Sequence, residues 1–206
     1  MQHDFILLDR SGSMKTLWEE ALGAVNSYVK KLAEDKIDTG VTLAVFDSPE
    51  GQSGAMDFKI VRDRIIPSTW HEVATTEVEP RGFTPLNDAT CQLVNLAKAG
   101  NYDKVAIIIM TDGAENASKE FTVTQAKLLL DQCRARGWQV IFLGANFDNA
   151  AQAASYGNSM RSTVQVARGN LQAATMSVNS ARAEYAATGA AMGFTDEEKR
   201  RLAEKK

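Results

Sequence analysis

The chain has 206 residues, of which 44% are hydrophobic and 24% are charged, and its formal net charge is −3. This composition is that of a globular protein with enough chain to bury a sizeable core, in one domain of ordinary size plus an appendage. The slight excess of acidic residues argues against a general nucleic-acid-binding surface, which would need clustered lysine and arginine.

Neither a membrane span nor a secretory leader is visible in the sequence. No apolar run approaches the ~20 residues that a spanning helix requires, and no basic segment followed by an apolar one stands at the start. The two cysteines, Cys91 and Cys133, lie in helical patterns without the spacing of a disulfide framework. We therefore expect both to be reduced core residues of a cytoplasmic protein, with a disulfide as the minor alternative.

The first predicted element is a buried strand that ends in a polar loop. Phe5 to Leu8 is an apolar run of the kind found in parallel strands covered on both faces. It leads into Asp9-Arg10-Ser11-Gly12-Ser13, so one carboxylate and two hydroxyls lie on the loop that leaves the strand. Apolar residues at steps of three and four then predict a helix over Thr16–Asp35.

A mostly apolar strand is predicted over Val41–Phe46, and a half-solvated edge strand over Asp57–Arg64, with a turn cluster between them at Ser48–Gly54. A long loop, Pro67–Phe83, then leads to a helix predicted over Pro85–Lys98. The short connection between the two strands favours antiparallel pairing. Proline directly after a hydroxyl residue, as in Thr84-Pro85, is typical of the first position of a helix.

The most hydrophobic run of the chain, Val105–Met110, predicts a central strand that ends in Thr111-Asp112-Gly113. A helix is expected after it over Thr122–Arg136, followed by a strand over Val140–Leu143. A short helix over Asn149–Ser155 and a last strand over Thr163–Val166 complete the alternation. Such alternation predicts an open, mostly parallel α/β sheet with helices on both faces.

The character of the chain changes at Gly169. The segment Leu171–Tyr185 has one apolar helical face but is rich in alanine, and Thr195 with Glu198 predicts a capping box at the start of a terminal helix. We therefore predict one domain over residues 1–168 and a helical C-terminal extension over residues 169–206.

Three polar segments are predicted to meet at one edge of the sheet. Asp9 and Asp112 follow strands, and Thr84 begins a helix on the same side; ligands in such sheets bind outside the carboxyl ends of the strands. Carboxylate and hydroxyl oxygens suit Mg²⁺, Mn²⁺ or Ca²⁺. Each piece alone has an ordinary alternative, as a turn or a helix cap. The combination predicts a divalent-cation site.

The same motifs resemble the metal-ion-dependent adhesion site (MIDAS) of the von Willebrand factor A (VWA) domain family. The resemblance rests on Asp9-x-Ser11-x-Ser13, on Gly82-Phe83-Thr84-Pro85-Leu86-x-Asp88-Ala89 and on Thr111-Asp112-Gly113, and it covers roughly Met1 to Val166. It implies a Rossmann-like sheet with one antiparallel edge strand and Mg²⁺ at its top. Ser11, Ser13 and Thr84 would bind the ion directly, and Asp9 and Asp112 largely through water. The motif is similar to that of intracellular bacterial and phage members.

These observations favour a non-enzymatic, cation-dependent protein-binding module. Hydroxyl ligands leave much of the ion's charge exposed, so a partner protein that presents Asp or Glu is the expected ligand. The candidate contact residues at the rim of the site are Arg10, Met14, Trp70, His71, Arg81, Phe83, Glu115 and Asn116. Packing is the simpler role for Trp70, and turn formation for Glu115 and Asn116.

Two other functions stay open at this stage. A metal-dependent hydrolase would need a nucleophile or general base beside the ion, whereas the only histidines are His3, before the first strand, and His71, on a distant loop. A structural or assembly subunit would act through the apolar face of Leu171–Tyr185. That face could pair with another copy, seat in a partner or, more simply, dock on the domain itself.

Overall fold

The computed structural model describes residues 1–49, 55–144 and 149–204. Its strands are β1 (Gln2–Asp9), β2 (Thr39–Asp47), β3 (Asp57–Ile65), β4 (Lys104–Thr111), β5 (Gln139–Gly144) and β6 (Thr163–Gln165). Its α-helices are α1 (Trp18–Glu34), α2 (Leu86–Ala99), α3 (Val123–Ala135), α4 (Asn149–Ser155), α5 (Leu171–Thr188) and α6 (Asp196–Ala203). Short 3₁₀ turns are η1 (Gly12–Thr16), η2 (Pro67–Thr69) and η3 (Met160–Ser162). Most of the turn cluster expected at Ser48–Gly54 lies outside the described residues.

The described strands form one sheet of six in the order β3-β2-β1-β4-β5-β6. All neighbours pair in parallel except β2 and β3, which are antiparallel. The fold class predicted from the sequence, a mostly parallel sheet with one antiparallel edge strand, is therefore confirmed.

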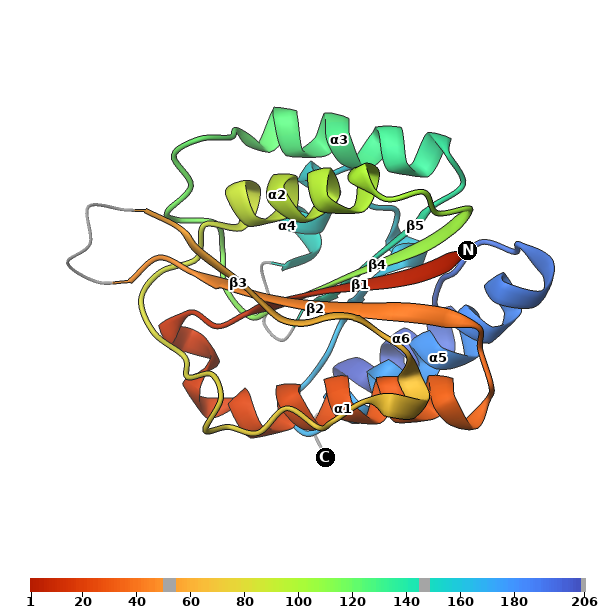
Figure 1. Ribbon diagram of the computed structural model, residues 1–206. Coiled ribbons are helices and arrows are strands. Elements are labelled where there is room, and N and C mark those ends of the chain that lie inside the picture. The colour runs from red at the N-terminus through yellow and green to blue at the C-terminus, as the bar shows by residue number, and fades with distance from the viewer. Residues whose placement is uncertain (50–54, 145–148, 205–206) are drawn as a thin grey trace.

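Helices cover both faces of the sheet (Figure 1). α1, α5 and α6 share one hydrophobic cluster with the sheet, and α2, α3 and α4 share the other. The central strands β1 and β4 are buried along nearly their whole length because each face meets a helical layer. Cys91 and Cys133 are free, buried thiols within the second layer, as expected.

The segment after Gly169, predicted to be a separate extension, packs against the rest of the chain. α5 lies beside α1, on the same face of the sheet (Figure 1), and Arg182 reaches from α5 to Asp4 in β1, with 2.7 Å between Nε and Oδ1. Both side chains are fully buried, and the Tyr28 hydroxyl donates to the other oxygen of Asp4 at 3.1 Å. At the start of α5, the Glu20 carboxylate accepts the N–H of Leu171 at 2.8 Å. The apolar face of α5 is therefore docked on its own domain.

β3 is an irregular edge strand. Its pairing with β2 shifts register on both sides of Leu43, and Arg64 has a left-handed backbone with φ of 51°. Lys59, Arg62, Asp63 and Arg64 place charges of both signs along it. Among the described helices, none is long and apolar enough to cross a membrane.

Candidate metal centre

The carboxyl ends of β1 and β4 bring two aspartates and two serines together. Asp9 ends β1, and its two carboxylate oxygens accept the backbone N–H of Ser11 and the hydroxyl of Thr111, each at 2.7 Å. The Ser11 and Ser13 hydroxyls are 3.0 Å apart, and Ser13 Oγ donates to Asp112 Oδ1 at 2.7 Å. Side chains from two separate loops thus form one hydrogen-bonded cluster.

Thr84 reaches the same cluster from a third segment. The position that a Cβ atom would take on Gly113 lies 3.0 Å from Thr84 Oγ1, 3.4 Å from Ser13 Oγ and 3.8 Å from Asp9 Oδ2. Oxygens from two of the segments therefore lie around Gly113 on the third, and the residue before it, Asp112, bonds to one of them, Ser13 Oγ. The sequence predicted this convergence from the topology alone.

The loop that follows β4 holds Thr84 in place through its backbone. The Thr84 hydroxyl does not cap helix α2. Asn116 accepts the N–H of Thr84 at 2.9 Å through its side chain and donates its own N–H to the Thr84 carbonyl at 3.1 Å. Glu115 accepts the N–H of Asn87 at 2.7 Å, so this loop satisfies the first turn of α2.

The start of α2 therefore differs from the sequence prediction. Pro85 precedes the helix instead of occupying its first position, and Thr84 makes no side-chain capping bond. A similar difference occurs at α1, which begins at Trp18 and not at Thr16, because Thr16 is the last residue of a 3₁₀ turn, η1, that leads the chain from Ser11 toward the helix.

Burial makes the cluster a poor environment for bare carboxylates. Burial raises the pKa of Asp9 to about 6, against the opposing hydrogen bonds from Thr111 and Ser11. Burial also raises the pKa of Asp112, against the hydrogen bond from Ser13. A bound cation would favour the charged form of both groups.

The donor set fits a hard divalent cation. It offers hydroxyl and carboxylate oxygens, which Mg²⁺, Mn²⁺ and Ca²⁺ accept readily. Within the described ranges no three His, Cys, Asp or Glu side chains group as a metal site, so any ion here would depend on the neutral hydroxyls. The three hydroxyls carry no charge, so within this set only Asp9 and Asp112 would offset the charge of the ion.

Two of the predicted rim residues, Arg10 and Arg81, form an ionic network behind the cluster. Arg10 Nε and Arg81 Nε donate to the two oxygens of the fully buried Asp47 at 3.0 and 2.7 Å. Both guanidinium groups also contact Asp57, and the Arg81 N–H donates to the Arg10 carbonyl at 2.8 Å. The network ties the loop before Thr84 to the loop after β1.

The other rim candidates differ in their exposure and in their distance from the cluster. Phe83 is half-exposed next to Thr84, and Asn116 is exposed. Met14 is buried in the core at 2% exposure, because η1 turns it inward, so it offers almost no surface to a partner. Trp70 bonds to Asn26, in the middle of α1, and His71 follows it, so the structure does not bring these two residues to the cluster.

Sequence reasoning assigned no role to Thr111, Gly113 or Gln152. Thr111 anchors Asp9, and Gln152 Nε2 donates to the Gly113 carbonyl at 3.1 Å, which fixes the loop after β4 against α4. Thr111 and Gly113 flank Asp112 in the motif and could have been included from it. Gln152 carries no signal in the sequence, because its contact depends on how α4 packs.

A sequence model of the family "von Willebrand factor type A domain" matches residues 5–193. This match runs through α5, beyond the end near Val166 expected from the motifs. No curated protein sequence matches the chain.

Solved structures share the fold. The manganese-loaded TRAP protein of Plasmodium vivax is 17% identical with a TM-score of 0.60, covering 84% of this chain and 71% of its own. The open pilus adhesin SpaC of Lactobacillus rhamnosus GG is 14% identical with a TM-score of 0.66, covering 89% and 30%. The domain of the pili tip protein Mfa5 of Porphyromonas gingivalis is 11% identical with a TM-score of 0.66, covering 95% and 98%. The chain thus spans under a third of the SpaC adhesin. Because the family model covers most of the chain, the protein belongs to the von Willebrand factor type A domain family.

Proposed function

We propose that the chain is a divalent-cation-dependent protein-binding module. Asp9, Ser11, Ser13, Thr84 and Asp112 would hold Mg²⁺, or Mn²⁺ or Ca²⁺ in its place. Bound there, the ion would supply positive charge that attracts an Asp or Glu side chain of a partner protein. The observation that carries the proposal is the convergence of three segments: oxygens of Thr84, Ser13 and Asp9 lie around Gly113, and Ser13 bonds to Asp112.

Two further observations support the proposal. The hydroxyl donors are neutral, so a bound cation would keep charge to offer a ligand. The structures similar in fold include a manganese-loaded protein and two pilus proteins, one of them an adhesin, which supports metal binding and protein binding as the class of function.

Half-exposed Phe83 is the strongest candidate for contact with a partner, since it adjoins Thr84 at the mouth of the cluster. Exposed Asn116 is a second candidate, although its side chain also holds Thr84. Arg10, Arg81 and Glu115 would act by positioning the loops around the ion. A cytoplasmic location, in a protein of the intracellular bacterial or phage type, is part of the proposal, supported by the two buried free thiols.

The metal part is tested by titrating the protein with Mn²⁺ and measuring free Mn²⁺ by electron paramagnetic resonance. Ser11→Ala and Asp112→Asn should each weaken binding at least about tenfold, and Mg²⁺ should compete with Mn²⁺. Ser180→Ala is the matched control, because its hydroxyl bonds within α5 to the Met176 carbonyl. Equal Mn²⁺ binding by all four proteins would refute the assignment.

The binding part is tested with the immobilised chain and a cell lysate. A protein retained in Mg²⁺ should be released by chelator and should not be retained by Ser11→Ala. Replacing one Asp or Glu of the retained protein by alanine should abolish its binding. Retention that survives both chelation and Ser11→Ala would contradict the proposal.

A further inference from the structure

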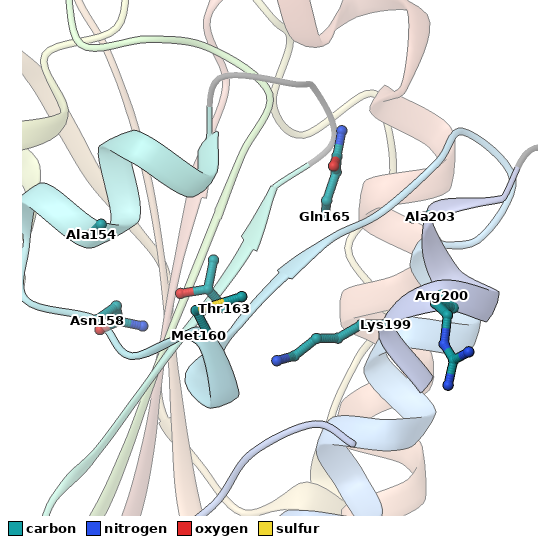
Figure 2. A pocket seen from close by; sticks show the side chains of 8 residues that line it. All are labelled: Ala154, Asn158, Met160, Thr163, Gln165, Lys199, Arg200 and Ala203. Carbon is teal, nitrogen blue, oxygen red and sulfur yellow. The ribbon is translucent and has the colours of Figure 1, made fainter. Parts of the chain in front are cut away.

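A groove of about 300 Å³ runs along the free edge of β6, far along the sheet from the aspartate cluster. It is bordered by α4 on one side and by α6 on the other (Figure 2). The residues that line it are Ala154, Asn158, Met160, Thr163, Gln165, Lys199, Arg200 and Ala203. Most of the exposed surface of the groove is apolar.

The backbone of β6 has hydrogen-bonding groups that face this groove. Val166 donates its N–H to the Gly144 carbonyl at 2.7 Å, and Gly144 lies opposite Gln165 in the ladder. In a parallel ladder of this register, the N–H groups that point toward β5 are those of Val164 and Val166. Because peptide groups alternate in direction along a strand, the N–H and C=O groups of Thr163 and Gln165 point outward. No described residue makes a hydrogen bond to these outward groups.

The two walls of the groove are fixed by their own contacts. Ala167 donates its N–H to the Leu202 carbonyl at 2.8 Å, which attaches α6 beside β6. Asn158 donates through its side chain to the Ser162 and Val140 carbonyls at 3.0 and 3.2 Å. The groove is therefore built into the fold.

Two side chains in the groove lack adequate partners among the described residues. Thr163 Oγ1 is buried and has no hydrogen bond. Lys199 extends across the groove toward Thr163 and Met160 (Figure 2). Its side chain is only 19% exposed, and the nearest carboxylate, that of exposed Asp196, is 3.8 Å away. The ammonium group of a side chain that is mostly covered, and that lies 3.8 Å from its carboxylate partner, gains from a second, closer carboxylate.

We propose that this groove binds an extended acidic segment of another protein, which joins the sheet as a further strand beside β6. Its backbone pairs with Thr163 and Gln165. Its side chains alternate between the two walls. Small apolar side chains face Ala154 of α4, and acidic side chains face Lys199 and Arg200 of α6.

Charge argues against a second copy of this chain as the occupant. Two β6 edges that paired with each other would bring two sets of Lys199 and Arg200 together, and the like charges would repel. An acidic segment instead supplies a carboxylate closer to Lys199 than that of Asp196. The site shares no residue with the proposed cation site, so binding here should not depend on metal.

The test uses the full chain labelled with ¹⁵N and a short peptide in which valine and glutamate alternate, in the presence of chelator. The amide signals of Thr163 and Gln165 should shift on titration. Lys199→Glu should weaken binding about tenfold, and a peptide with lysine in place of glutamate should bind Lys199→Glu better than it binds the original chain. Lys59→Glu, on β3 at the opposite edge, is the matched control.

Backbone pairing is tested on the peptide, which avoids any effect on the fold of the protein. One version is N-methylated at its valines and another at its glutamates. Since alternate N–H groups face β6, one version should lose binding and the other should retain it. The proposal fails if both methylated peptides bind equally, if Thr163 and Gln165 do not shift, or if Lys199→Glu leaves the affinity unchanged.

Discussion

Ser13 Oγ donates a 2.7 Å hydrogen bond to Asp112 Oδ1 across 99 positions of the sequence. This bond joins the loop after β1 to the loop after β4, and Gly113 lies directly beside it. The proposed cation would lie among the oxygens around Gly113. Four predictions concern this cluster and the core that supports it.

Gly113→Ala should weaken Mn²⁺ binding by about tenfold or more. The added Cβ would lie 3.0 Å from Thr84 Oγ1, so this donor would have to shift by a few tenths of an ångström, and it would touch Ser13 Oγ at 3.4 Å, where it takes up space beside both hydroxyls. Mn²⁺ titration with paramagnetic resonance measures the effect. Gly23→Ala is the control: that site in α1 has open space, and alanine there should stabilise the helix by about 0.5–1 kcal/mol without changing metal affinity.

Asp47→Asn should reduce metal affinity several-fold although Asp47 does not belong to the cluster. Its buried carboxylate accepts from both Arg10 and Arg81, and the loss of its charge leaves two guanidinium groups with a weaker partner. Loosening of the loop before Thr84 is the expected consequence. Asp57→Asn, at a 43% exposed carboxylate that contacts the same arginines, should have a smaller effect; an equal or larger one would contradict the argument.

Arg182→Met should destabilise the fold by about 3–5 kcal/mol, because it leaves the Asp4 carboxylate buried without a counter-charge. Asp4→Asn combined with Arg182→Met should cost less than the sum of the single changes. Urea unfolding measures all three. Lys31→Met breaks an exposed pair within α1 and should change the free energy of unfolding little.

His3 should make the fold acid-sensitive. Burial lowers its pKa from 6.5 to about 4, so the unfolded chain binds a proton at a higher pH than the folded one. Its contribution to stability is complete above pH 6.5 and is lost as pH falls toward 4, by up to about 3 kcal/mol. His3→Gln should flatten this part of the pH profile of urea unfolding, whereas replacement of exposed His71 by Gln should leave it unchanged.

The strands and the sites of the polar loops could be predicted because each rests on a local pattern. The apolar run before Asp9 and the one before Thr111 specify buried parallel strands, and parallel strands bring their carboxyl ends to one edge. The predicted start of α2 was wrong by one residue. Glu115 and Ser118, far along the chain, accept the N–H groups of the first turn of the helix in place of Thr84.

Contacts that depend on how a helix or turn docks could not be predicted. Met14 falls in a polar loop, yet η1 turns it into the core. Arg182 interrupts the apolar face of α5, and that interruption was the one sign in the sequence of a buried ion pair with Asp4. The groove beside β6 depends on where α6 docks, which no periodicity encodes.

The two edge strands of the sheet, β3 and β6, differ in regularity and charge, because β3 pairs irregularly with β2 and carries charges of both signs. Shifted register and charges of both signs disfavour a further strand at β3, whereas the outward peptide groups of β6 make no hydrogen bond to any described residue. A segment that joins at β6 therefore finds no second place to join, and molecules cannot link end to end into a fibre. Binding at this sheet should stop at one segment for each chain.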